Sequence, residues 1–205
     1  SRAIAEKLLE INAIKLRPNE PFQWASGWLS PIYCDNRILL SYPKIRSLVV
    51  NAMQEQAVNF EPFDYIAGVA TAGIPHGALL ADRLEKPFVY VRAKAKSHGR
   101  QNQIEGFIPK GASALVIEDL ISTGMSSLQA VRALQEAGVR IAGTLAIFTY
   151  GFPTANQAFN EASILLQTLT DYTTLLEVAR EKGYIKEESM EVLNRWRTAP
   201  DTWQP

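Results

Sequence analysis

Apolar runs that alternate with helical patterns constrain the fold of this chain more than any other feature. Such runs occupy residues 65–70, 88–91, 114–117 and 141–149, and residues 164–169 predict one more strand. A strand that is apolar along its whole length is buried on both faces, as in a parallel sheet covered by helices. The sequence therefore predicts an α/β fold in which a mostly parallel central sheet is flanked by helices. Ligands of such sheets bind outside the carboxyl ends of the strands.

The rest of the sequence predicts a single domain over residues 1–205, because no repeat, low-complexity tract or long linker divides it. Apolar residues at helical spacing predict helices over residues 4–11 and 43–58, and the C-terminal third is largely helical in pattern. Between the first two helices the chain is rich in Pro, Gly and Trp. We expect this stretch to form a small N-terminal hood, with its elements mainly in residues 1–40.

Charge and cysteine content exclude several classes of protein. The 21 Lys and Arg residues balance the 21 Asp and Glu residues, so the chain has no net positive charge with which to attract nucleic acid. No apolar run approaches the roughly 18–20 residues needed to cross a bilayer. The single cysteine, Cys34, excludes an intrachain disulfide and a cysteine-rich metal site. We therefore expect a cytoplasmic protein with no nucleic-acid partner and no membrane partner.

A cluster of acidic and hydroxyl residues follows the apolar run at residues 114–117. The acids are Glu118 and Asp119, and residues 122–127 contain Gly124 and four hydroxyl side chains. Such a segment at the start of a helix offers backbone N–H groups and hydroxyl donors to an anion, and the helix dipole adds to the attraction. Two carboxylates would repel a phosphate, but they suit the vicinal hydroxyls of a sugar. The alternative is an ordinary N-cap; the concentration of these groups at one strand end favours a sugar-phosphate site.

Basic side chains gather in the segment that follows residues 88–91. They are Arg92, Lys94, Lys96, His98 and Arg100, and the next acid along the chain is Glu105. A run of this kind is often no more than a solvated face. Beside a sugar-phosphate site, however, cations stabilise a leaving diphosphate, whose charge grows as the glycosidic bond breaks. A lid of this composition would also exclude water from the reacting sugar.

Three motifs together resemble the orotate phosphoribosyltransferases, a branch of the type I phosphoribosyltransferases. They are the strand, acid pair and Ser-Thr-Gly loop of residues 116–124, the basic loop of residues 91–99, and the hood sequence of residues 24–37. The resemblance covers almost the whole chain and implies the type I phosphoribosyltransferase fold. It implies transfer of ribose 5-phosphate from 5-phospho-α-D-ribose 1-diphosphate (PRPP) to orotate, which yields orotidine 5-monophosphate and pyrophosphate in pyrimidine biosynthesis.

The same resemblance implies a cofactor and a partner. The cofactor is Mg²⁺, held by PRPP rather than directly by the protein. The partner is a second copy of the chain, in a homodimer whose loop of residues 92–98 reaches the active site of the neighbouring subunit.

The resemblance also implies roles for individual residues. Arg92, Lys96 and His98 are the catalytic candidates, and a hydrogen bond within the loop is the alternative for His98. Ser122 is the candidate for orotate binding. Thr71, Ala72 and Gly73 form the pyrophosphate loop, for which a tight strand-to-helix turn is the alternative. The residues expected to bind PRPP are Arg92, Lys96, His98, Glu118, Asp119, Leu120, Ile121, Ser122, Thr123, Gly124, Met125 and Ser126.

Four departures from the better-known branch of the family leave the partner of the orotate carboxylate open. Ala25, Ala72, Ala93 and Tyr150 stand at or near positions where that branch has basic residues. The pattern instead resembles a bacterial branch of the family that lacks them.

The base pocket is expected in the hood. By resemblance, Ser26-Gly27 and Ser30-Pro31 line it through their backbone, because small residues let the chain approach a planar ring. The alternative is a packed turn stiffened by proline. Tyr33 and Arg37 are further candidates for stacking on the base or for pairing with its carboxylate.

Two other functions remain as alternatives. A phosphoribosyltransferase fold that only senses PRPP to control transcription would need a DNA-binding element, and no segment of the sequence resembles one. A purine or uracil transferase would share the phosphate loop, but the hood sequence before the sheet favours orotate. We expect a structural role for His76, which follows the pyrophosphate loop.

Overall fold

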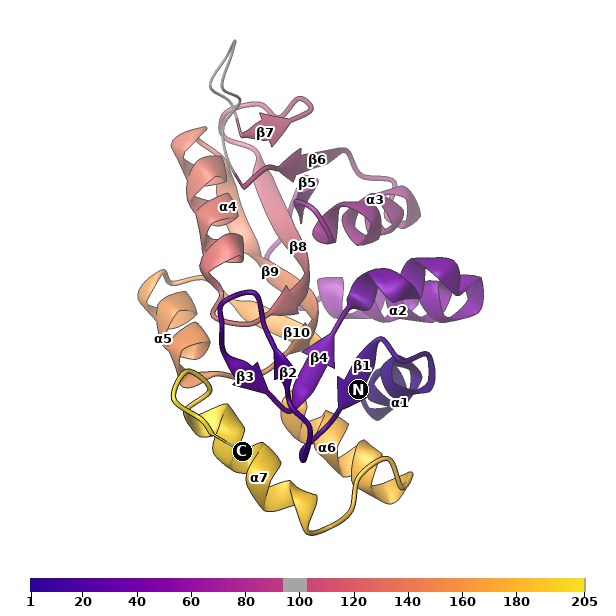
Figure 1. Ribbon diagram of the computed structural model, residues 1–205. Coiled ribbons are helices and arrows are strands. Elements are labelled where there is room, and N and C mark those ends of the chain that lie inside the picture. The colour runs from indigo at the N-terminus through magenta and orange to yellow at the C-terminus, as the bar shows by residue number, and fades with distance from the viewer. Residues whose placement is uncertain (94–102, 205) are drawn as a thin grey trace.

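A six-stranded sheet forms the centre of the molecule and confirms the predicted α/β fold (Figure 1). The computed structural model describes residues 1–93 and 103–204. The strands run in the order β10-β9-β8-β5-β6-β7, in which β7 is antiparallel to β6 and all other neighbours are parallel. The strands are β5 (Tyr65–Val69), β6 (Phe88–Val91), β7 (Ile104–Glu105), β8 (Ser113–Ile121), β9 (Arg140–Thr149) and β10 (Leu166–Asp171).

The strand β8 is longer than the sequence predicts. The apolar run at residues 114–117 indicated a strand that ends before the acid pair, but β8 continues to Ile121 and includes both acids. Parallel pairing with β9 extends the strand, since Glu118 pairs with Ala146 and Ile121 pairs with Thr149. Ladder hydrogen bonds join backbone groups, so polar side chains do not end the strand.

Helices cover both faces of the sheet, and the sheet separates two hydrophobic cores. α4 (Met125–Glu136) and α5 (Pro153–Glu161) cover one face, to which Val116 points. The other face, to which Ile117 points, packs against four helices. These are α1 (Arg2–Glu10), α2 (Pro43–Ala57), α3 (Gly73–Arg83) and α6 (Tyr172–Glu181). Neighbouring residues of β8 thus reach opposite cores, as the two-residue period of a strand requires.

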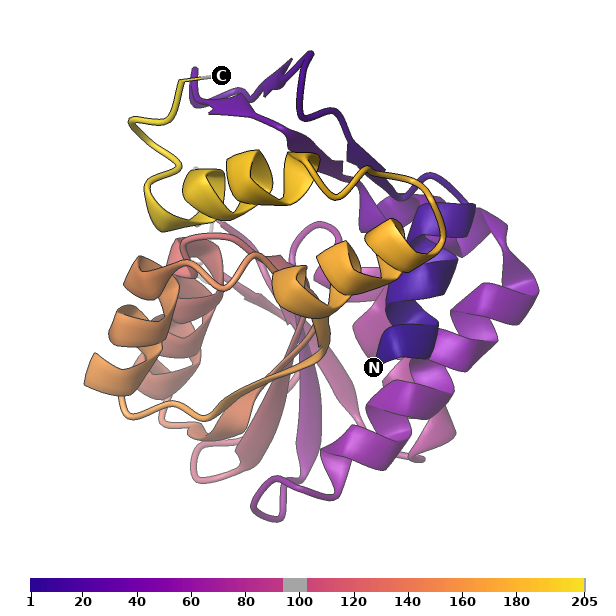
Figure 2. The same cartoon turned by 90° about the horizontal axis from the view of Figure 1, so that it is seen from below.

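The hood consists of two small antiparallel pairs that pack against the C-terminal helix. β1 (Ile14–Leu16) pairs with β4 (Ile32–Cys34), and β2 (Phe22–Gln23) pairs with β3 (Leu29–Ser30). A 3₁₀ helix, η1 (Asn36–Ser41), leads from β4 toward α2. α7 (Ser189–Thr198) lies against the hood (Figure 2), where the indole N–H of Trp196 donates to the carbonyl of Leu29 at 3.2 Å. The hood therefore contains short strands within a stretch rich in Pro, Gly and Trp, and the far end of the chain helps to hold it.

The strand order reverses between β5 and β8. β5 leads through α3 to β6 on one side, whereas β8 leads through α4 to β9 on the other. The connections after these two neighbouring strands therefore diverge, and such a reversal is the usual ligand site of an open α/β sheet. Among the helices of the described ranges, none combines the length and the apolar character needed to cross a membrane.

His76 is a fully buried histidine on α3, in keeping with the structural role expected for it. Neither ring nitrogen has a hydrogen-bond partner among the described residues. Burial disfavours the charged imidazolium and lowers the pKa of His76 from 6.5 to about 4. The folded protein therefore keeps this ring neutral under mildly acidic conditions.

We predict that His76→Leu flattens the acid side of the stability profile. Between pH 6.5 and about 4 the unfolded chain binds a proton at His76 that the folded chain does not. The free energy of unfolding therefore decreases as the pH is lowered through this range. The pKa difference corresponds to about 3 kcal/mol, and this loss is absent from the variant. Denaturant unfolding of both proteins, from neutral pH down to the pKa of the buried ring, measures it. Parallel profiles for wild type and variant would contradict the prediction.

Candidate active site

The turn between β8 and α4 presents backbone donors that no described side chain caps. Gly124 occupies the N-cap position of α4 with φ of 80°, and within residues 1–93 and 103–204 no side chain makes a cap hydrogen bond there. The first N–H groups of a helix have no acceptor within it, and the positive end of the dipole lies at the same point. The alternative that Ser122 or Thr123 is an ordinary N-cap is therefore wrong. This turn has the geometry of an anion site.

Glycine is required at position 124 because of both backbone and packing. Its left-handed φ is unfavourable for other residues, and a Cβ there would lie 2.8 Å from the ring of Phe159 on α5. Around it, Ser126 and Met125 are exposed and Thr123 is half-buried. Ile121 differs, since its side chain is fully buried and its carbonyl accepts the N–H of Tyr150.

Glu118 and Asp119 lie on opposite faces of β8 and differ in access. Glu118 is buried. Its carboxylate accepts a hydrogen bond from the hydroxyl of Ser127 at 3.2 Å and another from the N–H of Asp119 at 3.0 Å. Asp119 is half-buried and is the more accessible acid. That both acids bind ribose hydroxyls stays a prediction. Ser127, which the sequence placed among the donors for an anion, instead holds Glu118 in the core.

Burial raises the pKa of both acids. For Glu118, desolvation is the main cause and the adjacent charge of Asp119 adds to it. For Asp119, desolvation is again the largest cause, and hydrogen bonds together with the charge of Arg37 oppose it. A ligand that brings hydroxyl donors or a cation would favour the charged form of the pair. The site is therefore electrostatically suited to a sugar, and not to a bare anion, at this point.

The turn between β5 and α3 lies directly against the acid pair. A Cβ on Gly73 would overlap the carbonyl oxygen of Ile117 and would lie 3.3 Å from Cα of Glu118. Glycine at this position therefore allows Thr71, Ala72 and Gly73 to approach the end of β8. The peptide bond between Ala70 and Thr71 is cis. Close contact with the acid segment is the geometry expected of a pyrophosphate loop.

Arg92 follows β6 and lies near both turns. It lines a hollow of about 30 Å³ together with Ala70 and Ser126. Its guanidinium lies 3.4 Å from the carboxylate of Glu105, and its side chain is 40% exposed, so a ligand can reach it. The other two catalytic candidates, Lys96 and His98, lie outside the described residues.

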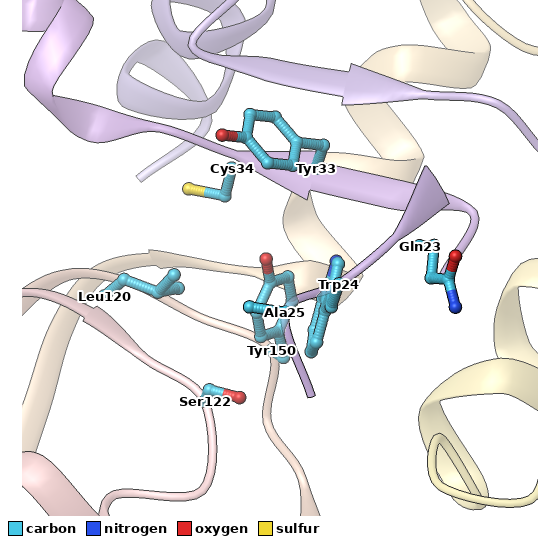
Figure 3. A pocket seen from close by; sticks show the side chains of 8 residues that line it. All are labelled: Gln23, Trp24, Ala25, Tyr33, Cys34, Leu120, Ser122 and Tyr150. Carbon is cyan, nitrogen blue, oxygen red and sulfur yellow. The ribbon is translucent and has the colours of Figure 1, made fainter. Parts of the chain in front are cut away.

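A cavity of about 400 Å³ opens between the hood and the end of β8 (Figure 3). Figure 3 shows Tyr33 and Cys34 on one side of it and Leu120 and Ser122 on the other. None of the described residues that line the cavity carries a charged side chain. Because Ser122 belongs to the turn before α4, the cavity adjoins that turn. The lining residues are Gln23, Trp24, Ala25, Tyr33, Cys34, Leu120, Ser122 and Tyr150.

The structure changes the predicted lining of this pocket. Tyr33 and Ser122 line it as expected, but Ser26-Gly27 and Ser30-Pro31 are not among its lining residues. The hydroxyl of Ser30 is buried and donates to the carbonyl of Ile32 at 2.8 Å. Arg37 makes a two-pronged pair with Asp35, at 2.7 and 2.9 Å, and does not line the cavity. Its existing partner explains why it is not aimed at a base.

Tyr150 is a cavity residue that the sequence identified only as a missing basic position. Burial raises the pKa of its hydroxyl well above the ordinary value, so the group stays neutral. Figure 3 shows this hydroxyl pointing toward Tyr33 and Cys34. The ring is fixed by aromatic neighbours from distant segments, with centroids 5.3 Å from Trp24 and 5.5 Å from Trp196. Gln23, Trp24 and Cys34 were also not predicted to line it, because long-range packing brings them there.

Comparisons with known proteins agree with this geometry. A phosphoribosyl transferase domain model matches residues 37–168, more than half of the chain, and this defines the class. The chain is 53% identical over 203 residues to the orotate phosphoribosyltransferase of Listeria monocytogenes serotype 4b (strain F2365), covering 98% of this chain and 97% of that one. It is 54% identical over 200 residues to the orotate phosphoribosyltransferase of Bacillus pumilus, covering 97% and 94%.

Solved structures support the same assignment. The orotate phosphoribosyltransferase of Aeropyrum pernix matches with a TM-score of 0.78 at 29% identity, covering 89% of this chain and 99% of that one. The chain belongs to the orotate phosphoribosyltransferase family. The resemblance that the three sequence motifs indicated is thereby confirmed.

We predict that Gly73→Ala impairs activity more than it impairs folding. The added methyl group meets the backbone of Ile117, so the pyrophosphate loop must move relative to the acid pair. A displacement of about 1 Å in a positioned site can cost on the order of 10²-fold in kcat/KM. Steady-state kinetics with PRPP and orotate measure the loss.

Gly77→Ala is the matched control, since it lies one turn further along α3. Its methyl group would meet the ring of Phe88 at 2.9 Å, away from the acid pair. A similar loss of kcat/KM in both variants at similar thermal stability would contradict the prediction.

Proposed function

We propose that the chain transfers the 5-phosphoribosyl group of PRPP to orotate, which gives orotidine 5-monophosphate and pyrophosphate. The observation that carries the proposal is the position of Ser122. This residue belongs both to the turn that opens α4 and to the lining of the hood cavity. A sugar phosphate held at the turn would therefore present its reactive carbon to a base held in the cavity. The neighbouring family members named as orotate phosphoribosyltransferases support the same reaction.

The ribose 5-phosphate is proposed to bind at the start of α4. Its phosphate would accept from the uncapped N–H groups after Gly124 and from the hydroxyls of Thr123 and Ser126. The ribose hydroxyls would then donate to the acid segment. Of the two acids, Asp119 is the more accessible, and Glu118 supports it from the core side of the strand.

The leaving diphosphate is proposed to lie between the pyrophosphate loop of residues 71–73 and Arg92. The loop borders the acid segment, and Arg92 lies beside Ser126 at the start of α4. Positive charge here would stabilise the growing charge of the diphosphate in the transition state. Lys96 and His98, by their resemblance to the family's catalytic loop, are proposed to add to it.

The chemistry places modest demands on acid–base catalysis. The bond between N1 of orotate and C1 of the ribose forms while the bond from C1 to the diphosphate oxygen breaks, and the electron pair leaves with pyrophosphate. Ionised orotate needs little activation at N1, so no strong general base is required. Positioning and charge stabilisation account for the rate.

We propose Mg²⁺ as the cofactor, carried by the diphosphate and ribose hydroxyls of PRPP. Within residues 1–93 and 103–204, no group of three or more His, Cys, Asp or Glu side chains is arranged to hold a metal ion. The half-buried carboxylate of Asp119 fits an ion that arrives with the substrate, because a cation would offset the desolvation that raises its pKa. Such an ion would neutralise charge on the diphosphate.

We also propose a homodimer in which the loop of residues 92–98 reaches the partner's active site. The loop begins after β6, which lies beside the two-residue strand β7 at one edge of the described sheet. A reducing cytoplasmic compartment is proposed because Cys34, which lines the cavity, is a free thiol.

A panel of nucleobases tests the proposed reaction. With PRPP and Mg²⁺ present, we expect pyrophosphate release with orotate and little with adenine, guanine or uracil. Release with a purine or with uracil alone would replace this proposal by one of the other transferase activities. If no base supports release while PRPP still binds, the chain is a sensor instead.

We predict that Tyr150→Phe raises KM for orotate about tenfold with little change in KM for PRPP. The cavity lining holds no charged side chain among the described residues, so neutral donors must meet the polar edge of the base. Loss of one hydrogen bond to a charged acceptor weakens binding by about this factor. Tyr172→Phe is the control, since that buried hydroxyl donates to the carbonyl of Leu193 at 3.0 Å, outside the cavity. An unchanged KM for orotate in Tyr150→Phe would show that this hydroxyl does not contact the base.

A further inference from the structure

We propose that Asn36 is a positioning residue that fastens the acid segment of β8 to the hood. This inference rests on the proposed function, because it concerns how the ribose site is held. Asn36 is fully buried at the start of η1. Its side-chain amide donates from Nδ2 to the backbone carbonyl of Asp119 at 2.8 Å.

The carbonyl of Asp119 needs such a donor because no strand of the described residues lies beside it on that edge. β5 accompanies β8 only from Ala114 to Ile117, and beyond that point the chain turns away into the pyrophosphate loop. On the edge toward β5, the carbonyl of Ser113 accepts the N–H of Asp64. Alternate carbonyls of a strand point to the same edge, so those of Ile117 and Asp119 follow in the same direction.

These last two carbonyls have different neighbours on this edge. Ile117 still pairs with Gly68 of β5, and its carbonyl lies against Gly73 in the turn that follows. The carbonyl of Asp119 lies beyond that turn and accepts from Asn36. A buried backbone carbonyl without a donor is costly, so the hood takes the place of the absent strand here. The end of β8 is thereby held on both edges, by β9 and by Asn36.

The amide acts at this position only as a donor among the described residues. Its Oδ1 atom is buried and accepts no hydrogen bond from them. An aspartate in its place would turn an acceptor toward the carbonyl of Asp119 and would add negative charge beside an acid whose pKa burial already raises. The donor, and not merely the size of the side chain, is therefore what the acid segment requires.

The segment that holds Asp119 also forms a wall of the base cavity. Tyr33 and Cys34 line the cavity, and Asn36 follows two residues later. Between them the carboxylate of Asp35 accepts the N–H of Arg37 and begins η1, which fixes the position of Asn36. One short segment thus sets both the wall of the base cavity and the backbone of the proposed ribose acid. Asn36 holds the two halves of the site at a fixed separation.

PRPP binding in the absence of orotate tests the proposal. Titration calorimetry with PRPP and Mg²⁺ is carried out on wild type, Asn36→Asp and Asn36→Ser, together with steady-state kinetics and thermal unfolding. We expect PRPP affinity to fall about tenfold in Asn36→Asp, the scale of a lost buried hydrogen bond. We expect a smaller loss in Asn36→Ser, whose hydroxyl retains a donor. KM for PRPP should rise by more than kcat falls.

Ser30→Ala is the matched control from the same hood. Among the described residues its buried hydroxyl bonds only to the backbone of Ile32, so its loss weakens the hood without reaching β8. PRPP affinity that is unchanged in both Asn36 variants, or that falls equally in Ser30→Ala, would overturn the positioning role. If Asn36→Asp does not fold, Asn36→Ser decides in the same way. Failure of the proposed function differs, since wild type would then release no pyrophosphate with orotate.

Discussion

The pairing of β8 between β5 and β9 is the constraint on which the rest of the structure depends. On one edge β9 follows β8 as far as Ile121, so both acids lie on a paired strand and not on a loop. On the other edge β5 stops early, and the turn of residues 71–73 and the hood lie there instead. Unequal partner strands therefore create the site and also hold it.

A cluster of aromatic rings connects the hood to this frame. Trp24 of the hood, Tyr150 after β9 and Trp196 on α7 pack against one another with centroids 5.3 to 5.6 Å apart. These rings come from the beginning, the middle and the end of the chain. Buried aromatic side chains contribute much of the stability of such contacts. The hood cavity consequently borders the folded core and does not depend on a single loop.

Local patterns predicted the elements well and the contacts between them poorly. The apolar runs at residues 88–91 and 141–149 correspond to β6 and β9, because uniform burial leaves a direct mark on composition. The end of β8 was misplaced, since pairing with β9 and not hydropathy extends it. Arg37 was proposed to face the base, but its neighbour Asp35 already pairs with it. Ser127 was expected to face an anion, but helix rotation turns it toward Glu118.

The sequence by itself determined the class of fold, the acid pair with its hydroxyl-rich turn, and the family to which the chain belongs. These depend on residues that are neighbours in the chain, where spacing alone fixes periodicity and backbone chemistry. Only the tertiary structure decided that Glu118 is buried while Asp119 is accessible, that Tyr150 lines an uncharged cavity, and that Asn36 reaches Asp119 across 83 residues. Such relations arise from the order of strands in the sheet and from long-range packing, which no local pattern encodes.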